Sequence, residues 1–171
     1  MRAAVSSFWL VRRLRLMAVL GTVVASAACA TSPSLTSPSA PSPAGTAAVD
    51  STQSFCTAEI NRYRAIAGLP ALGRGTDLES FATEAVEFDA RLGVPHQYFM
   101  QTNGGGVSRA ENQLLLWKGY AVNEVIRQGL ATMWAEGPTG SHYQVLTGNY
   151  RNVGCGIFAS GNEVSISQDF R

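Results

Sequence analysis

Residues 141–170 read SHYQVLTGNYRNVGCGIFASGNEVSISQDF, and this stretch decides the fold class. From Val153, apolar residues at every second position alternate with Gly154, Gly156 and Phe158 as far as Gly161-Asn162, and a second alternation, with polar residues, runs from Val164 to Phe170. Alternation with a period of two indicates half-buried strands, and a Gly-Asn pair between two such runs indicates a tight turn. The segment therefore predicts a β-hairpin with one face toward a core.

Three amphipathic helices are predicted upstream of this hairpin. Apolar residues recur at helical spacing in windows at about 51–67, 76–92 and 123–134. Their N-terminal caps are expected at Ser51 or Thr52, in a Thr76–Glu79 capping box, and at Asn123. Residues 98–107, YFMQTNGGGV, are expected to form a loop. Helices first and strands last predict an α+β fold, with helices packed on an antiparallel sheet.

The N-terminal segment has the features of an export signal. Residues 1–28 hold four arginines and no acid, and residues 16–25, LMAVLGTVVA, form an apolar run that is too short to span a bilayer. Small residues then precede Cys29, which is similar to the lipidation site of a bacterial lipoprotein. The alternative is ordinary cleavage after residues 25–27 and secretion. We expect a signal peptide at 1–28, a Ser/Pro-rich disordered tether at 29–49 and a folded domain at 50–171.

Charge and cysteine content narrow the class of protein. The formal net charge is +1, and it falls to −3 once the four arginines of residues 1–28 are removed. A mildly acidic domain lacks the basic surface that nucleic acid requires, so a nucleic-acid partner is not expected. If Cys29 carries a lipid, Cys56 and Cys155 remain as a pair. In an oxidising compartment such a pair tends to form a disulfide, and the alternative is two buried free thiols.

The residues that could carry chemistry are few. The chain has two histidines, His96 and His142, and both lie in or beside turn-rich segments. No HExxH, CxxC, GxSxG or phosphate-loop motif is present. A lone histidine is more often structural than catalytic. The spacing of His96 and His142 in the sequence does not by itself show that the two side chains converge.

A family resemblance adds to this interpretation. Residues 141–156 are similar to the G-H-Y-x-Q and V-G-C-G segments of the CAP superfamily, which comprises the cysteine-rich secretory, antigen 5 and pathogenesis-related class 1 proteins. Four other segments resemble the family in the right order: 61–72, 110–112, 133–136 and 167–170. The resemblance implies an α–β–α sandwich with a central cleft. It also implies a tetrad of two histidines and two glutamates in that cleft, at His96, Glu111, Glu136 and His142.

Three roles for this tetrad are open. The imidazoles of His96 and His142 suit zinc or another divalent metal, with Glu111 and Glu136 as candidate catalytic or ligand groups. That chemistry would make the protein a metal-dependent hydrolase of envelope or extracellular polymers. Alternatively, the protein is a binding module that takes a small-molecule, lipid or peptide ligand in its cleft. A third possibility is a polar network that only shapes the cleft. In each case we expect an exported protein, anchored to a membrane through Cys29 or secreted.

Overall fold

The computed structural model describes residues 43–171; the predicted signal peptide, Cys29 and most of the predicted tether lie outside the described residues. Its elements along the chain are α1 (Pro43–Ile66), β1 (Gly73–Arg74), α2 (Thr76–Leu92), α3 (Gln97–Thr102), the 3-10 helix η1 (Gly104–Gly106), β2 (Ala110–Lys118), α4 (Val122–Ala135), α5 (Ser141–Leu146), β3 (Asn152–Ser160) and β4 (Glu163–Phe170). The predicted α+β class is confirmed. Within this part of the chain, no helix combines the length and apolar character needed to cross a membrane.

The predicted hairpin is formed by β3 and β4, which pair from Val153 opposite Phe170 to Ser160 opposite Glu163. These strands lie in a four-stranded sheet with the order β1-β3-β4-β2. The sheet is mixed rather than wholly antiparallel, because the two-residue strand β1 runs parallel to β3. The Gly73 amide donates to the Arg151 carbonyl over 2.9 Å at this pairing.

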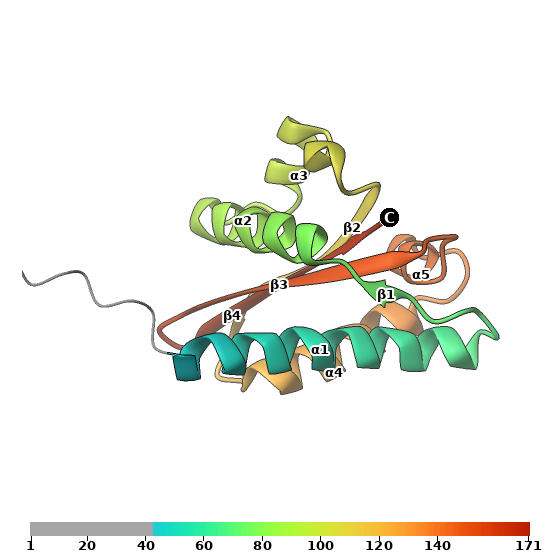
Figure 1. Ribbon diagram of the computed structural model, residues 1–171, viewed down its shortest axis with the longest axis horizontal. Helices are drawn as coiled ribbons and strands as arrows, with labels where there is room; N and C mark the ends of the chain where they lie inside the picture. The colour runs from blue at the N-terminus through green and yellow to red at the C-terminus, as the bar shows by residue number, and fades with distance from the viewer. Residues whose placement is uncertain (1–42) are drawn as a thin grey trace, which may run out of the picture. The chain divides into compact units, whose positions relative to one another are not determined.

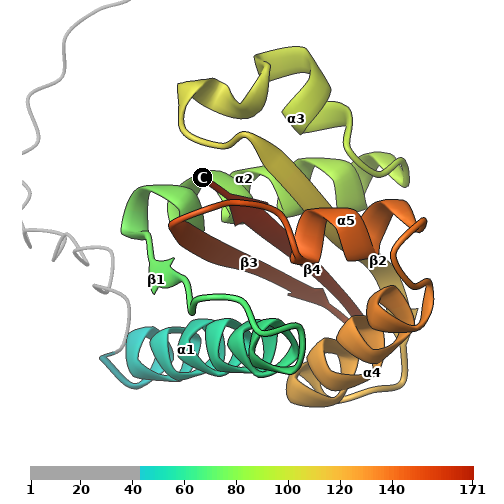
Figure 2. The same ribbon diagram turned by 90° about the vertical axis from the view of Figure 1, so that its right-hand side faces the viewer.

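Helices cover both faces of the sheet (Figure 1). Helix α2 lies on one face, and α1 and α4 lie on the other; Figure 2 shows α5 beside α4 and α3 beyond α2. This is the α–β–α sandwich that the resemblance to the CAP superfamily implies. The hairpin was predicted to meet a core on one face, and the structure buries both faces. Ser165, Ser167 and Asp169 on the other face are fully buried beneath α2.

Two glycines of β3 explain how closely α2 approaches. A Cβ atom at Gly154 would lie 2.3 Å from the Glu79 backbone nitrogen, and one at Gly156 would lie 2.1 Å from the Ala82 carbonyl carbon. Such distances are far inside van der Waals contact, so a side chain at either position would separate the layers. The V-G-C-G segment is therefore a packing motif: its glycines admit α2 on one face, and its cysteine points to the other.

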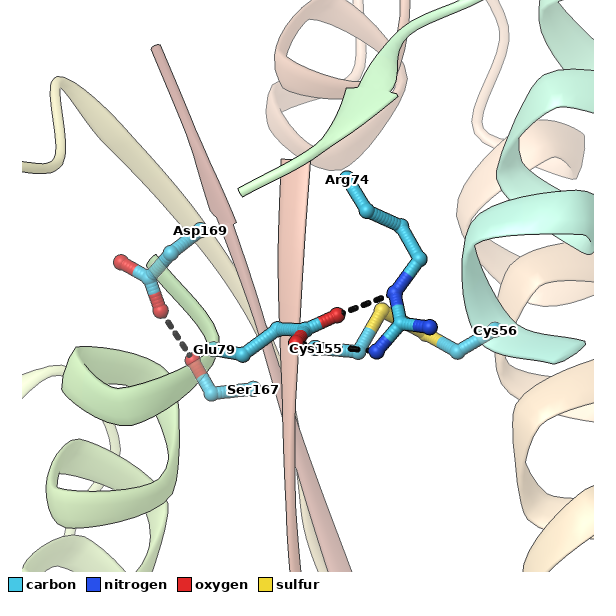
Figure 3. The surroundings of a disulfide bond; sticks show 6 residues. All are labelled: Cys56, Arg74, Glu79, Cys155, Ser167 and Asp169. Carbon is cyan, nitrogen blue, oxygen red and sulfur yellow. Dashed lines mark hydrogen bonds and ion pairs between the residues drawn. A yellow bond between two sulfur atoms is a disulfide. The ribbon is translucent and has the colours of Figure 1, made fainter. Parts of the chain in front are cut away.

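The predicted disulfide is confirmed. Cys56 of α1 and Cys155 of β3 are bonded with an S–S distance of 2.06 Å, and both residues are fully buried. Figure 3 shows the bond between the α1 helix and the sheet. It lies in an apolar core that includes Ile60, Leu130 and Ile166. The first helix and the last hairpin are thus joined covalently through the centre of the domain.

The first helix begins earlier than predicted. Helix α1 starts at Pro43, so residues 43–49 of the predicted tether are helical. Ser51 and Thr52 lie inside the helix and donate their hydroxyl hydrogens to the Ala48 carbonyl over 2.8 and 3.0 Å rather than capping it. Proline is well suited to the first turn of a helix, because its missing N–H would have no helical partner there.

The predicted caps of the other two helices were also wrong. At α2 the N-cap is Gly75, and the Glu79 carboxylate instead binds the Arg74 guanidinium over 2.6 and 3.0 Å (Figure 3). A two-bonded, charge-assisted contact is stronger than a cap to a neutral amide. Helix α4 begins at Val122 with Ala121 as its N-cap, so the predicted cap residue Asn123 lies inside the helix.

Strand β2, which forms one edge of the sheet, was not predicted at all. Its alternation is hidden because Glu111, Asn112 and Gln113 follow one another as buried polar residues. A bulge between Leu114 and Trp117 further breaks the period of two. The predicted loop at 98–107 also proved to hold the short helices α3 and η1.

Candidate functional site

His96 occupies a strained position between α2 and α3. It is the N-cap of α3 with a φ of 65°, in the left-handed region that side chains other than glycine rarely adopt. Its backbone amide donates to Oε1 of Gln113 over 3.0 Å. Strain of this kind costs about 1–3 kcal/mol and persists where the surroundings fix the residue, often at functional sites.

The His96 imidazole is oriented by a buried carboxylate. Its Nδ1 lies 2.8 Å from Oε1 of Glu111 on β2, whose side chain is 1% exposed, whereas the His96 side chain is 36% exposed. The hydrogen bond to Glu111 raises the pKa of His96 above its ordinary value, and burial opposes this effect. A partly exposed imidazole thus stands in front of a fully buried glutamate.

Behind Glu111, two further residues extend the polar chain into the sheet. The Ser167 hydroxyl oxygen lies 3.0 Å from Oε2 of Glu111 and 2.9 Å from Oδ2 of Asp169, and its single hydrogen serves one of them at a time (Figure 3 shows the contact with Asp169). Burial raises the pKa of Asp169 to about 7, and the charge of Glu111 is the second-largest cause of this increase. A protonated Asp169 can donate to Ser167, which leaves the serine hydrogen for Glu111.

Asp89 and Gln113 hold this side of the site in place. The Asp89 carboxylate accepts from the Tyr98 amide over 2.9 Å and from the Gln113 side-chain amide over 2.8 Å. Gln113 in turn accepts from the His96 amide. Helix α2, strand β2 and the start of α3 are therefore linked by one buried carboxylate. Sequence reasoning missed this group, although Asp89 falls on the apolar stripe of the second predicted helix.

The second histidine forms a separate pair. Nδ1 of His142, in the first turn of α5, lies 2.5 Å from Oε1 of Glu136, and the His142 amide donates to Oε2 over 3.1 Å. The hydrogen bond with His142 holds the pKa of Glu136 below its ordinary value. Gly140 makes this fold-back possible, since a Cβ there would lie 2.3 Å from Cβ of Glu136.

Strand β2 connects the two pairs. Glu111 binds His96, and the next residue, Asn112, donates its side-chain amide to the His142 carbonyl over 3.1 Å. Successive strand residues point to opposite faces, so the Glu-Asn dipeptide fastens one pair on each side of the edge strand. Within residues 43–171 neither imidazole Nε2 has a hydrogen-bond partner, and both histidine side chains are 36% exposed.

The donor set was compared with the requirements of a zinc centre. Structural zinc takes four protein ligands, and catalytic zinc takes three plus water. Among the described residues, no group of three or more His, Cys, Asp or Glu side chains is placed to hold a metal ion. The two pairs therefore do not fit a closed zinc site. Binding of a metal by His96 and His142 alone stays a prediction.

A cavity of about 580 Å³ lies at the end of the sheet where β2 and β3 begin and β4 ends. None of the four tetrad residues predicted for the cleft is among its lining residues, which are Arg109, Asn149, Tyr150, Arg151, Asn152 and Arg171. Arg109 directly precedes β2, two residues before Glu111. Sequence reasoning missed this cavity because its residues come from the ends of three strands, one of which was not predicted.

Comparisons with known proteins give similarities of fold only. No protein-family profile matches the sequence, and no curated protein matches it. The chain is similar to an outer surface protein from Borrelia burgdorferi, with 17% identity and a TM-score of 0.48, over 68% of this chain and 89% of that one. It is also similar to a cysteine-rich secretory protein from Staphylococcus aureus subsp. aureus Mu50, with 16% identity and a TM-score of 0.46, over 71% of this chain and 39% of that one.

Proposed function

We propose that this chain is an exported binding module, held at a membrane by a lipid on Cys29, that contacts its ligand through the imidazoles of His96 and His142. The observation that carries the proposal is the geometry of the two histidines. Each ring is oriented by a carboxylate at Nδ1 and leaves Nε2 free within the described residues. A carboxylate at one nitrogen fixes the tautomer and orientation of the ring, so that the other nitrogen is preorganised for a ligand.

Export is supported by the buried disulfide. Disulfides persist in oxidising compartments and are rare where thiols are kept reduced. The Cys56–Cys155 bond is fully enclosed in the core. The basic start, the short apolar run and the small residues before Cys29 agree with export, and helix α1 begins only fourteen positions after that cysteine. A lipid there would hold the domain close to the bilayer.

A small polar molecule, a lipid headgroup or a peptide could meet this pair of outward nitrogens. His96 and its buried glutamate favour a ligand atom that accepts a hydrogen bond, because the raised pKa of the ring keeps it more often protonated. The hydrolase alternative has less support. Glu111 and Glu136 are both engaged in orienting histidines, and no observation of this structure favours a reaction at either.

Labelling with radioactive palmitate tests the anchor. Wild-type protein made in bacterial cells should carry the label, and Cys29→Ser should not. Cys29→Ser should also move from the membrane fraction to the soluble exported fraction. Equal label in the variant would end the lipid-anchor proposal and leave ordinary signal cleavage and secretion in its place.

Nuclear magnetic resonance of the histidine rings tests the site. The Hε1 resonances of His96 and His142 should shift when lysophosphatidylcholine micelles or the peptide tetra-alanine are added. Glu111→Gln keeps the shape of its side chain but removes the charge that orients His96, so it should reduce the His96 shift and leave the His142 shift unchanged. If neither probe moves either resonance, the rings do not contact a ligand of this kind and the proposal is wrong.

A further inference from the structure

The cavity of about 580 Å³ is lined by residues at or just beyond the ends of β2, β3 and β4. The Arg109 amide, just before β2, donates to the Phe170 carbonyl at the end of β4 over 2.8 Å. At the start of β3, the Arg151 and Asn152 amides donate to the Arg171 carbonyl over 2.7 and 2.8 Å. These bonds hold Arg109, Arg151, Asn152 and Arg171 against the ends of the strands, whereas Asn149 and Tyr150 lie in the segment that leads into β3.

The pairing of the arginines sets this cavity apart. Residues 43–171 contain eight arginines. Five of them bind carboxylates: Arg62, Arg74, Arg91, Arg127 and Arg171. A sixth, Arg64, is buried and donates to backbone carbonyls. Within this part of the chain only the Arg109 and Arg151 side chains form neither an ion pair nor a hydrogen bond, and both line the same cavity.

The remaining lining residues are also polar. Arg171 contributes a guanidinium that is bound to Asp77 over 2.6 and 3.2 Å, so its charge is largely balanced. Asn149, Tyr150 and Asn152 add two side-chain amides and a hydroxyl, and no aspartate or glutamate is in the lining. The two unpaired arginines thus face a space surrounded by hydrogen-bonding groups, without an acidic side chain to compete for them.

We propose that this cavity binds a sugar phosphate, with Arg109 and Arg151 on the phosphate and the amides of Asn149 and Asn152 on sugar hydroxyls. The planar guanidinium donates two parallel hydrogen bonds to phosphate oxygens, which a lysine cannot do. Small-molecule sites span about 300–1,000 Å³, so this volume exceeds the need of a single ion. Such sites are usually apolar, and a predominantly polar lining favours a ligand covered with hydroxyl groups.

A sugar phosphate can be free in solution or can form the headgroup of a lipid, and two probes separate these sources. Calorimetric titration of the purified full chain with glucose 6-phosphate tests the free form, and co-sedimentation with phosphatidylcholine vesicles containing phosphatidylinositol 4-phosphate tests the lipid form. At least one should bind. Glucose, which lacks the phosphate, should bind at least tenfold more weakly than glucose 6-phosphate.

Matched variants decide whether these probes bind in the cavity. Arg109→Gln and Arg151→Gln should each weaken binding at least tenfold, and both should fold, because these side chains are exposed and unpaired. Arg91→Gln alters an exposed arginine near the end of α2 that does not line the cavity, and this variant should bind like the wild type. His96→Ala should also bind like the wild type, so the outcome is separate from the role proposed for the imidazoles. Failure of both probes, or unchanged binding by the Arg109→Gln, Arg151→Gln double variant, would overturn the proposal.

Discussion

Replacing Gly156 by alanine should separate the two layers that the V-G-C-G segment holds together. The added Cβ would lie 2.1, 2.2 and 2.3 Å from the Ala82 carbonyl carbon, the Ala82 oxygen and the Thr83 nitrogen. Ordinary contact begins at about 3.4 Å, so α2 would have to move by more than an ångström. These are backbone atoms of a helix and cannot rotate aside as a side chain could.

The expected cost follows from the packing of α2. Overpacking a core typically costs about 1–3 kcal/mol, and a clash with rigid backbone belongs at the upper end of that range. For a domain of this size such a loss lowers the melting temperature by roughly 10 °C. Circular dichroism during heating measures this, and a urea titration gives the free energy of unfolding independently.

Gly45→Ala is the matched control, because a Cβ at Gly45 has no atom within 4 Å. Alanine exceeds glycine in helix propensity by up to about 1 kcal/mol, so this variant should melt at the wild-type temperature or slightly above it. If Gly156→Ala melts at the same temperature as the wild type, the close approach of α2 does not depend on the glycine and the packing argument is refuted.

Three further changes have defined outcomes. Arg64→Met leaves three buried or half-buried carbonyl contacts without their donor and should cost about 2–4 kcal/mol in urea unfolding, whereas Arg62→Met, which removes a surface ion pair, should cost less than about 1 kcal/mol. The pKa of Asp169 is about 7 in the fold and about 4 in the unfolded chain, so its contribution to the free energy of unfolding is present below pH 4 and is lost as the pH rises to 7. Over that interval the free energy of unfolding of the wild type should fall, relative to Asp169→Asn, by about 1.4 kcal/mol per pH unit. Parallel pH profiles of the two proteins would contradict this. Zinc titration followed by calorimetry checks the two-histidine metal prediction: one site that disappears in His96→Ala or His142→Ala would support it, and identical titrations of all three proteins would refute it.

The parts of the fold that were predicted correctly depend on local patterns. The hairpin at 153–170 carries its own alternation and its own turn, and the helices carry apolar stripes. The Cys56–Cys155 pairing followed from a cysteine count and an export signal. Each of these inferences needs only neighbouring residues or composition, which the sequence presents directly.

The parts that were missed depend on tertiary contacts. Strand β2 places Glu111, Asn112 and Gln113 in a row, and each buried side chain forms a hydrogen bond with a residue outside the strand. A pattern of hydrophobicity cannot reveal strands whose inward residues are polar. Helices α3 and α5 have six residues each, which is too short for a helical period to be recognised.

In the candidate site too, some residues could be predicted from the sequence and others depend on tertiary contacts. The family resemblance named both histidines and both glutamates, and the structure pairs His96 with Glu111 and His142 with Glu136. The resemblance did not name the residues that support them. Asp169 lies on the face of the hairpin for which no core contact was predicted, and its burial beneath α2 could not be read from the strand itself.

The disulfide also determines how the domain would respond to mechanical load. A chain anchored near its N-terminus is pulled through α1, and Cys56 lies within that helix. The bond passes tension directly to β3, so the stretch from Cys56 to Cys155, which are 99 positions apart, cannot unravel while the bond is intact. Fully extended, that stretch would span roughly 340 Å. Under mechanical load, a domain with the disulfide intact therefore extends only through the segments outside Cys56 and Cys155. A domain with the disulfide reduced can also extend through the stretch between these residues.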